Sequence, residues 1–194
     1  MLGCGAASNA AFVSQSQSNV NRSEGTQHYR NACVITWEAG EAILEARVET
    51  IKLPRARETE SLPSARLRIR NLSNGQTIYE RDEADSFLTM YREAVNDDVG
   101  EALILRWAGG SAERLEILDV DRNQARRIFY ESYRVDASLV NVGGNSRVIL
   151  LTTCDGGAGP CFTNRFVWRG GKYQKAGTIP SERFDAAMER LFGR

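Results

Sequence analysis

The sequence has few of the residues and motifs on which common enzyme mechanisms depend. It contains a single histidine, His28, which lies in a polar segment. A Ser-His-Asp or Cys-His arrangement needs a rigidly held histidine, so we do not expect catalysis of that kind. The glycine-rich segment at residues 154–160 lacks the Lys-Ser/Thr ending of a phosphate-binding loop. We therefore assign no catalytic residue.

Net charge and long apolar runs are missing as well. Lys+Arg and Asp+Glu both number 25, so the formal net charge is zero. Nothing in the bulk charge attracts the chain to nucleic acid or to an anionic membrane. No apolar run approaches the roughly 20 residues that span a bilayer. With 42% hydrophobic and 26% charged residues over 194 positions, the composition is that of an ordinary globular domain.

The cysteines do not fit a zinc site, because only one pair is close and its spacing is wider than C-x2-C. That pair is Cys154 and Cys161, in the segment CDGGAGPC between two strand-like runs at 147–153 and 164–169. Glycine lets the loop bend enough to bring the two sulfurs together. We predict a disulfide across a hairpin loop, with reduced thiols or a metal or redox role as alternatives. A disulfide would indicate an oxidising compartment outside the cytosol.

The first 32 residues differ from the rest of the chain. Residues 14–27 are rich in Ser, Asn and Gln, so we expect residues 1–32 to be a disordered tether. The start LGCG resembles the end of a bacterial lipoprotein signal, in which a small residue precedes a lipidated cysteine. It departs from the usual pattern, which has leucine one place earlier, and the apolar run of such a signal would lie upstream. The resemblance implies lipidation of Cys4, and the alternative is an incidental cysteine.

A period of two dominates from residue 33 onward and predicts a single β-rich domain over 33–194. The run ARLRIRN, for example, places Leu67 and Ile69 on one face and three arginines on the other. Short strands separated by Gly- and Asn-rich turns are typical of antiparallel meanders. Residues 42–50 fit a strand better than a helix, whereas residues 86–95 fit either. Further strand candidates lie at 33–37, 102–107, 113–120, 126–132, 137–142, 147–153, 164–169 and 173–177.

The meander repeats at an offset of about 46 to 51 residues, the length of one four-stranded propeller blade. Residues 68–80 align with 116–131, residues 96–107 align with 142–153, and 165–177 is a third copy of the hairpin. The run NDDVGEALIL resembles the FG-GAP/VCBS-type propeller repeats through Asn96, Asp97, Asp98, Gly100, Glu101 and Leu103. The copy at 142–150 has no acidic residues. The resemblance implies loops that bind calcium and a role in adhesion or protein contact.

About three blades fit between residues 35 and 180, whereas closed propellers have four or more. We therefore expect a mainly β fold of antiparallel meanders with blade-like repeats, as a partial propeller completed by another chain. A small sandwich or barrel and an open stack of meanders are the alternatives. An amphipathic helix is predicted at 181–192, with Ser181 as N-cap and Phe184, Met188 and Leu191 on its apolar stripe. It would cover the open end of the sheet or dock a partner.

Three sets of polar residues are candidate sites. The carboxylates of Asp97, Asp98 and Glu101 would serve an envelope hydrolase or hold calcium, and their alternative is a solvated turn. DVDRN has oxygens at the first, third and fifth positions of a calcium loop, namely Asp119, Asp121 and Asn123, but Gln124 stands where glycine is expected, which favours a plain turn. The arginines Arg66, Arg68 and Arg70 would contact an anionic glycan or pair with Glu80 and Asp82 on a neighbouring strand.

These observations lead to an exported bacterial protein of the periplasm or cell surface, with a lipid on Cys4 as its one link to the membrane. We expect it to bind a protein or glycan of the cell envelope, without a cofactor and without catalysis. The alternatives are an envelope hydrolase using the carboxylates near 97–101 and a cytosolic protein with reduced thiols. Trp37, Trp107 and Trp168 are expected in or near the core, unless they converge as a sugar-binding platform.

Overall fold

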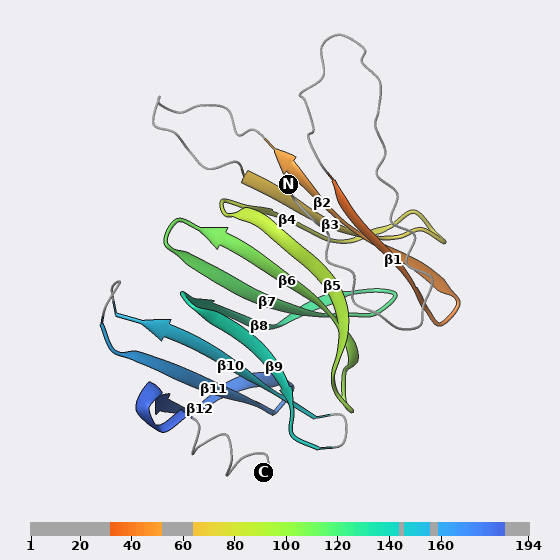
Figure 1. The fold of residues 1–194 in the computed structure, drawn as a ribbon. Helices are drawn as coiled ribbons and strands as arrows, with labels where there is room; N and C mark the ends of the chain where they lie inside the picture. The colour runs from red at the N-terminus through yellow and green to blue at the C-terminus, as the bar shows by residue number, and fades with distance from the viewer. Residues whose placement is uncertain (1–31, 52–63, 144–145, 156–158, 185–194) are drawn as a thin grey trace, which may run out of the picture. The chain divides into compact units, whose positions relative to one another are not determined.

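The computed structural model describes residues 32–51, 64–143, 146–155 and 159–184, and twelve β-strands run through them (Figure 1). They form three four-stranded antiparallel sheets, each made of four consecutive strands in chain order. The N-terminal sheet holds β1 (Cys33–Ala39), β2 (Ala42–Ile51), β3 (Ser64–Asn71) and β4 (Thr77–Glu83). The middle sheet holds β5 (Ser86–Asn96), β6 (Gly100–Gly109), β7 (Ala112–Val120) and β8 (Ala125–Tyr133). The C-terminal sheet holds β9 (Asp136–Asn141), β10 (Arg147–Cys154), β11 (Cys161–Arg169) and β12 (Lys172–Pro180).

The predicted mainly β fold of antiparallel meanders is confirmed. Each period-two run named from the sequence is a strand, including residues 42–50 within β2. Residues 86–95, which also had helical spacing, form the strand β5. Its backbone is hydrogen-bonded to β6 in the middle sheet, so tertiary pairing overrides the local helical pattern.

The chain folds into two compact units that divide the strands of the middle sheet between them. The first unit comprises Met1–Tyr91, Leu105–Gly110 and Val120–Arg126. The second comprises Arg92–Ile104, Ser111–Asp119 and Arg127–Arg194. Strands β6 and β7 thus each contribute residues to both units.

The core of the first unit lies on one face of the N-terminal sheet. Alternate residues of β2 and β3 are buried there, with Leu44, Ala46, Leu67 and Ile69 fully enclosed. Cross-strand pairing places Ala46 opposite Ile69 and Val48 opposite Leu67, so the apolar side chains form continuous rows. The residues between them point to the other face and are charged, which is why this sheet has one dry and one polar face.

The core of the second unit is built on the C-terminal sheet. Four consecutive residues of β10, Val148 to Leu151, are buried, so this strand is covered on both faces. Phe129 of β8 meets the ring of Phe166 edge-on with centroids 4.9 Å apart, and it contacts Tyr173 at 5.9 Å. The Tyr173 hydroxyl donates a hydrogen bond to the backbone carbonyl of Val95, at 3.1 Å. These contacts join β12 and β11 to strands of the middle sheet.

Two segments for which the sequence made predictions lie partly or wholly outside the described residues. Ser181–Arg183 form a 3-10 helix whose N-cap is Pro180, and no side chain caps it, so the predicted capping role of Ser181 is wrong. Residues 185–194, which hold most of the predicted helix at 181–192, are not described, and neither are residues 1–31 of the tether predicted at 1–32. Across the described part of the chain, no helix has the length and apolar character needed to span a membrane.

Candidate functional site

A disulfide joins Cys154, the last residue of β10, to Cys161, the first residue of β11. The two cysteines are direct cross-strand partners in the register of this hairpin, and their Cα atoms lie 3.9 Å apart. The sulfurs meet because antiparallel pairing has already brought the two β-carbons to the same face. The prediction of a covalent link across this loop is confirmed, against a pair of reduced thiols. Cys4 lies outside the described residues, and Cys33 is buried in β1.

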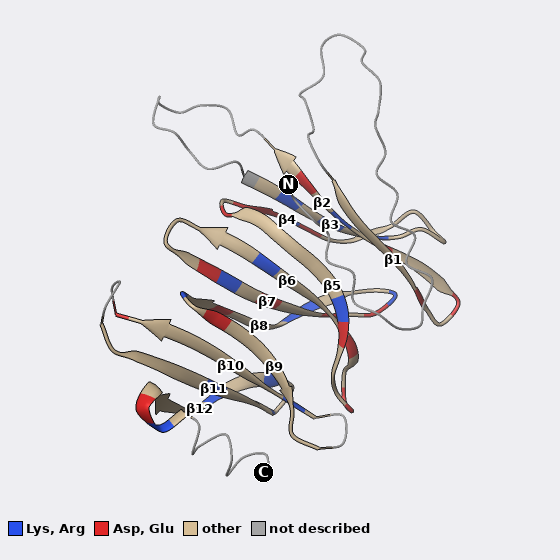
Figure 2. Ribbon diagram, in the orientation of Figure 1, with Lys and Arg blue, Asp and Glu red and all other residues tan. Residues whose placement is uncertain are grey.

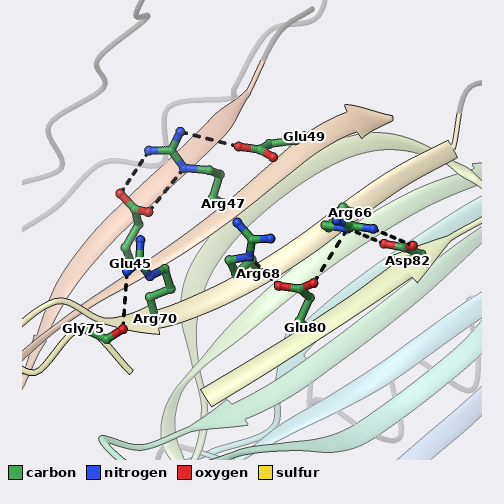
Figure 3. Close-up of polar contacts among 9 residues, drawn as sticks. All are labelled: Glu45, Arg47, Glu49, Arg66, Arg68, Arg70, Gly75, Glu80 and Asp82. Atoms are coloured by element: carbon green, nitrogen blue, oxygen red, sulfur yellow. Dashed lines mark hydrogen bonds and ion pairs between the residues drawn. The ribbon is translucent and has the colours of Figure 1, made fainter. Parts of the chain in front are cut away.

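The predicted arginine residues Arg66, Arg68 and Arg70, which we call the arginine row, lie side by side on the polar face of β3 (Figure 3). Figure 2 shows blue segments on β3 beside red segments on β4. The cross-strand register places Arg66 opposite Asp82 and Arg68 opposite Glu80. The sequence analysis predicted this pairing with β4 as one of the two roles of the row.

Two arginines of the row form ion pairs with the neighbouring strand. Arg66 donates two hydrogen bonds to the Asp82 carboxylate, with Nε–Oδ1 at 2.6 Å and Nη2–Oδ2 at 3.0 Å. Arg68 Nε donates to Glu80 Oε2 at 2.5 Å. The hydrogen bond from Arg68 lowers the pKa of Glu80, and that from Arg66 lowers the pKa of Asp82. Both carboxyls therefore lose a proton more readily than the same carboxyls without these hydrogen bonds.

Arg70 differs from the other two members of the row. Its cross-strand neighbour on β2 is Glu45, but Glu45 is bound to Arg47 at 3.3 Å. Arg70 Nη2 donates to the Gly75 carbonyl at 3.4 Å, and its buried Nε has no hydrogen-bond partner. The row thus contains one guanidinium that is held by a backbone carbonyl and not by a carboxylate.

Strand β2 adds charges that the sequence analysis did not assign to this face. Arg47 lies between Glu45 and Glu49, at 3.3 and 3.7 Å, and it is the cross-strand partner of Arg68 (Figure 3). The face therefore carries four arginines and four carboxylates on β2 to β4, and three of the arginines, Arg47, Arg66 and Arg68, are in ion pairs. Such pairs are partly exposed and contribute little stability each, but together they fix the directions of long side chains.

The carboxylates expected to work together near residue 97 are used in separate contacts. Asp98 accepts a 2.7 Å hydrogen bond from the indole nitrogen of Trp168, and Glu101 forms a 2.9 Å ion pair with Arg92. Asn96 Oδ1 accepts from the backbone nitrogen of Val99 at 2.8 Å, which closes the turn between β5 and β6. The contact of Asp98 links this turn to β11, and a catalytic role of these carboxylates or a solvated turn both stay predictions.

The β7–β8 turn likewise satisfies its own acidic side chain. Asp121 accepts hydrogen bonds from the backbone nitrogens of Asn123, at 2.7 Å, and Gln124, at 2.9 Å. These bonds, that from Asn123 first, lower the pKa of Asp121. A hollow of about 560 Å³ lies here, lined by Ala39, Gly40, Val120, Asp121, Arg122 and Asn123. Among the described residues, no group of three His, Cys, Asp or Glu side chains is placed to hold a metal ion. Calcium at Asp119, Asp121 and Asn123, or at the turn around Asp97, stays a prediction.

The burial of a charged residue on β7 was not anticipated from the sequence. Glu116 of β7 is fully buried and accepts a 3.0 Å hydrogen bond from Arg127 of β8. The Arg127 guanidinium also lies over the Tyr130 ring, 4.5 Å from its centroid. A period-two reading of ERLEILDV places Glu116 opposite the apolar face, so its burial shows that β7 is covered on both sides. The sequence did carry a sign of this burial, because apolar residues stand on both sides of Glu116, at 115, 117 and 118.

The three tryptophans differ in their exposure to solvent. Trp37 and Trp107 are buried, whereas Trp168 is partly exposed and packs edge-on against Tyr173 at 5.4 Å. Trp107 also contacts Phe87 edge-on at 5.7 Å. Two of the three rings therefore serve the core, as the first reading of their role predicted.

Comparisons of the chain with protein-family models, with curated proteins and with solved structures found no match.

Proposed function

We propose that the protein is exported to the bacterial cell envelope and acts there by binding another protein or a glycan, without catalysis. The observation that carries this proposal is the Cys154–Cys161 disulfide. Structural disulfides form and persist in the periplasm and at cell surfaces, whereas reducing systems keep most cytosolic thiols free. The resemblance of LGCG to a lipoprotein signal supports the same location and adds a lipid anchor at Cys4.

Labelling of the proposed lipid anchor tests the location directly. Cells that express the full chain from its natural gene would be labelled with radioactive palmitate, beside cells that express Cys4→Ser. Label on the native chain that is lost in Cys4→Ser supports the anchor. Export without label would leave a periplasmic protein and would overturn the anchor alone. Recovery of the native chain in the cytosolic fraction would overturn the proposal.

The contacts of the acidic residues favour binding over hydrolysis. General acid and base catalysis by two carboxylates requires that both face one substrate at a set separation. Asp98 is engaged by Trp168 and Glu101 by Arg92. Cells that produce an Asp97→Asn, Asp98→Asn, Glu101→Gln variant would be compared with cells that produce the native chain, and the phenotype of the cell envelope would be scored. An unchanged phenotype supports the binding function, whereas loss of the phenotype from a folded variant would favour the hydrolase.

We infer that the three meanders are blade-like repeats of a partial propeller. The support is that each sheet consists of four consecutive strands in order, as in a propeller blade. Gly100 has φ of +71°, which fits the loop glycine on which the resemblance to FG-GAP/VCBS-type repeats depends. Small-angle scattering of the full chain would distinguish a partial propeller from a sandwich of face-to-face sheets.

The arginine row is the part of the described surface best suited to an anionic group on such a partner. Arg70 is the member of the row whose guanidinium is held by a backbone carbonyl and not by a carboxylate, so an anionic group would not have to displace a carboxylate to pair with it. Arg66 is already held by both oxygens of Asp82 and is the matched control. Binding to isolated cell-wall glycan would be measured for the native chain, for Arg70→Gln and for Arg66→Gln, each of which removes one charge. The proposal expects a larger loss in the first variant, and equal binding by all three chains would refute this role.

A further inference from the structure

The outer strands of the three sheets differ in how well they are protected against pairing with another strand. Natural proteins protect edge strands with charged residues, prolines, β-bulges or short length, because an open edge presents unpaired backbone groups. Each four-stranded sheet has two outer strands, and together these are β1, β4, β5, β8, β9 and β12. The protections can therefore be compared strand by strand.

Five of the six outer strands carry such protection. Strand β4 has four successive charged residues and a register shift opposite it, between Ile69 and Arg70. Strand β12 has two lysines, ends at Pro180 and lies beside a register shift between Arg165 and Phe166. Strands β5 and β8 carry charged residues in their interior, and β9 is the shortest of the remaining strands, with 6 residues.

Strand β1 lacks these features. Its sequence CVITWEA has one charge, Glu38, next to its last residue, and it contains no proline. Its pairing with β2 runs from Cys33 to Ala39 without a register shift. Among the described strands, β1 pairs with β2 alone. Three β-branched residues at 34–36 make it the strand best suited to accept a further neighbour.

We propose that β1 pairs antiparallel with β1 of a second copy of this chain, which joins two N-terminal sheets into one continuous eight-stranded sheet. An antiparallel pair of identical strands has two-fold symmetry, the commonest symmetry of soluble oligomers. The dyad must pass through a residue and not between two residues, because only then do apolar side chains of both copies share one face.

A dyad at Thr36 gives the best set of cross-strand neighbours. It places Thr36 opposite its own copy, Ile35 opposite the second copy's Trp37, and Val34 opposite the second copy's Glu38. Thr–Thr pairs and pairs of an aromatic with a β-branched residue are among those that stabilise antiparallel strands. Ile35 and Trp37 are buried on the core face, so the pairing continues the existing apolar rows.

On the polar face, one pair of opposite charges comes within reach in the same register. Val34 is the cross-strand partner of Arg47 on β2, whose guanidinium also contacts Glu45 and Glu49. The second copy's Glu38, opposite Val34, would then lie two strands from Arg47, with about 10 Å between the backbones. A long arginine and a glutamate side chain can span that distance. The dyad repeats the contact, so two such pairs of opposite charge flank the central threonines.

Site-directed crosslinking tests the register in the full chain. In a Cys4→Ser background, Thr36→Cys places two thiols opposite each other at a separation that a disulfide can close. Mild oxidation is expected to give a crosslinked dimer. Arg47→Cys, on the next strand and away from the dyad, is the matched control and should give none. Failure of Thr36→Cys to crosslink, or equal crosslinking by both variants, would overturn the proposal.

The mass in solution provides a second, independent measurement. Light scattering across a concentration series should show a species of about 43 kDa, twice the 21.6 kDa of one chain. Thr36→Lys is tolerated by the monomer, because Thr36 is half-buried beside Glu45, but it sets two lysines opposite each other in the dimer. The variant should therefore shift to the monomer mass, while Thr178→Lys on β12 should not. A native chain that stays monomeric throughout, or a Thr36→Lys variant that stays dimeric, would refute pairing through β1.

Discussion

Removal of the disulfide should lower the stability of the protein by an amount that follows from the length of the loop it closes. Cys154 and Cys161 are 7 positions apart in sequence. In the chain-entropy model, closing a loop of that size in the unfolded chain is worth about 2.4 kcal/mol at 25 °C. For a protein of this length, the same loss corresponds to a fall of roughly 5–10 °C in Tm.

The assay is urea unfolding of the Cys154→Ser/Cys161→Ser variant beside the native chain, followed by tryptophan fluorescence. Trp168 lies on β11, the strand that begins at Cys161, so the signal reports on the sheet that the disulfide closes. Reduction of the native chain should reproduce the stability of the double variant. Cys4→Ser should leave stability unchanged and serves as the control for thiol removal.

A double variant with the stability of the native chain would refute this reasoning. It would mean that the antiparallel hairpin of β10 and β11 is fully held by its backbone and side-chain contacts, among them the 2.9 Å hydrogen bond between Thr152 and Thr163. A much larger loss, with collapse of the whole fold, would also contradict the model, because the entropic effect of so short a loop is limited.

Two further predictions concern packing and pH. Gly109→Ala should destabilise the fold by about 1–3 kcal/mol, because its β-carbon would lie 2.6 Å from Oδ1 of buried Asp85, whereas Gly177→Ala meets no atom within 4 Å and should be nearly neutral in thermal unfolding. The arginine row lowers the pKa of Glu80 and Asp82, so the stabilising effect is present above their unfolded-state pKa and is lost as pH falls through the lowered folded-state pKa. Since these carboxylates are 40% and 44% exposed, the loss should be under about 1 kcal/mol for each pair and smaller in high salt. Urea titrations at several acidic pH values should show it in the native chain but not in Glu80→Gln/Asp82→Asn, and identical pH profiles would contradict the assignment.

The polar face of β3 could be predicted from the sequence because the residues that determine it are neighbours along the chain. Alternation in ARLRIRN fixes which side chains share a face, and the turn that follows brings β4 back beside it. The carboxylates two residues apart on β4 then become cross-strand partners of the arginines. The role of Glu45 and Arg47 could not be predicted in this way, because β2 and β3 are joined by a long segment that does not fix their register.

Contacts between distant strands were also beyond the sequence. Asp98 and Trp168 are separated by 70 positions, and nothing local to either residue indicates that they meet. The same holds for Glu116, whose burial depends on what covers the second face of β7. The local pattern predicted a strand with one wet face, and only tertiary packing decides whether that face stays in water.

The redox state of Cys154 and Cys161 in the native host tests the central claim most directly. The protein would be isolated without reductant, its free thiols alkylated at once, and its peptides analysed by mass spectrometry. An exported contact protein should yield the single tryptic peptide that holds both cysteines, unalkylated and with its internal disulfide intact. Full alkylation of both cysteines would contradict export and would indicate a cytosolic protein.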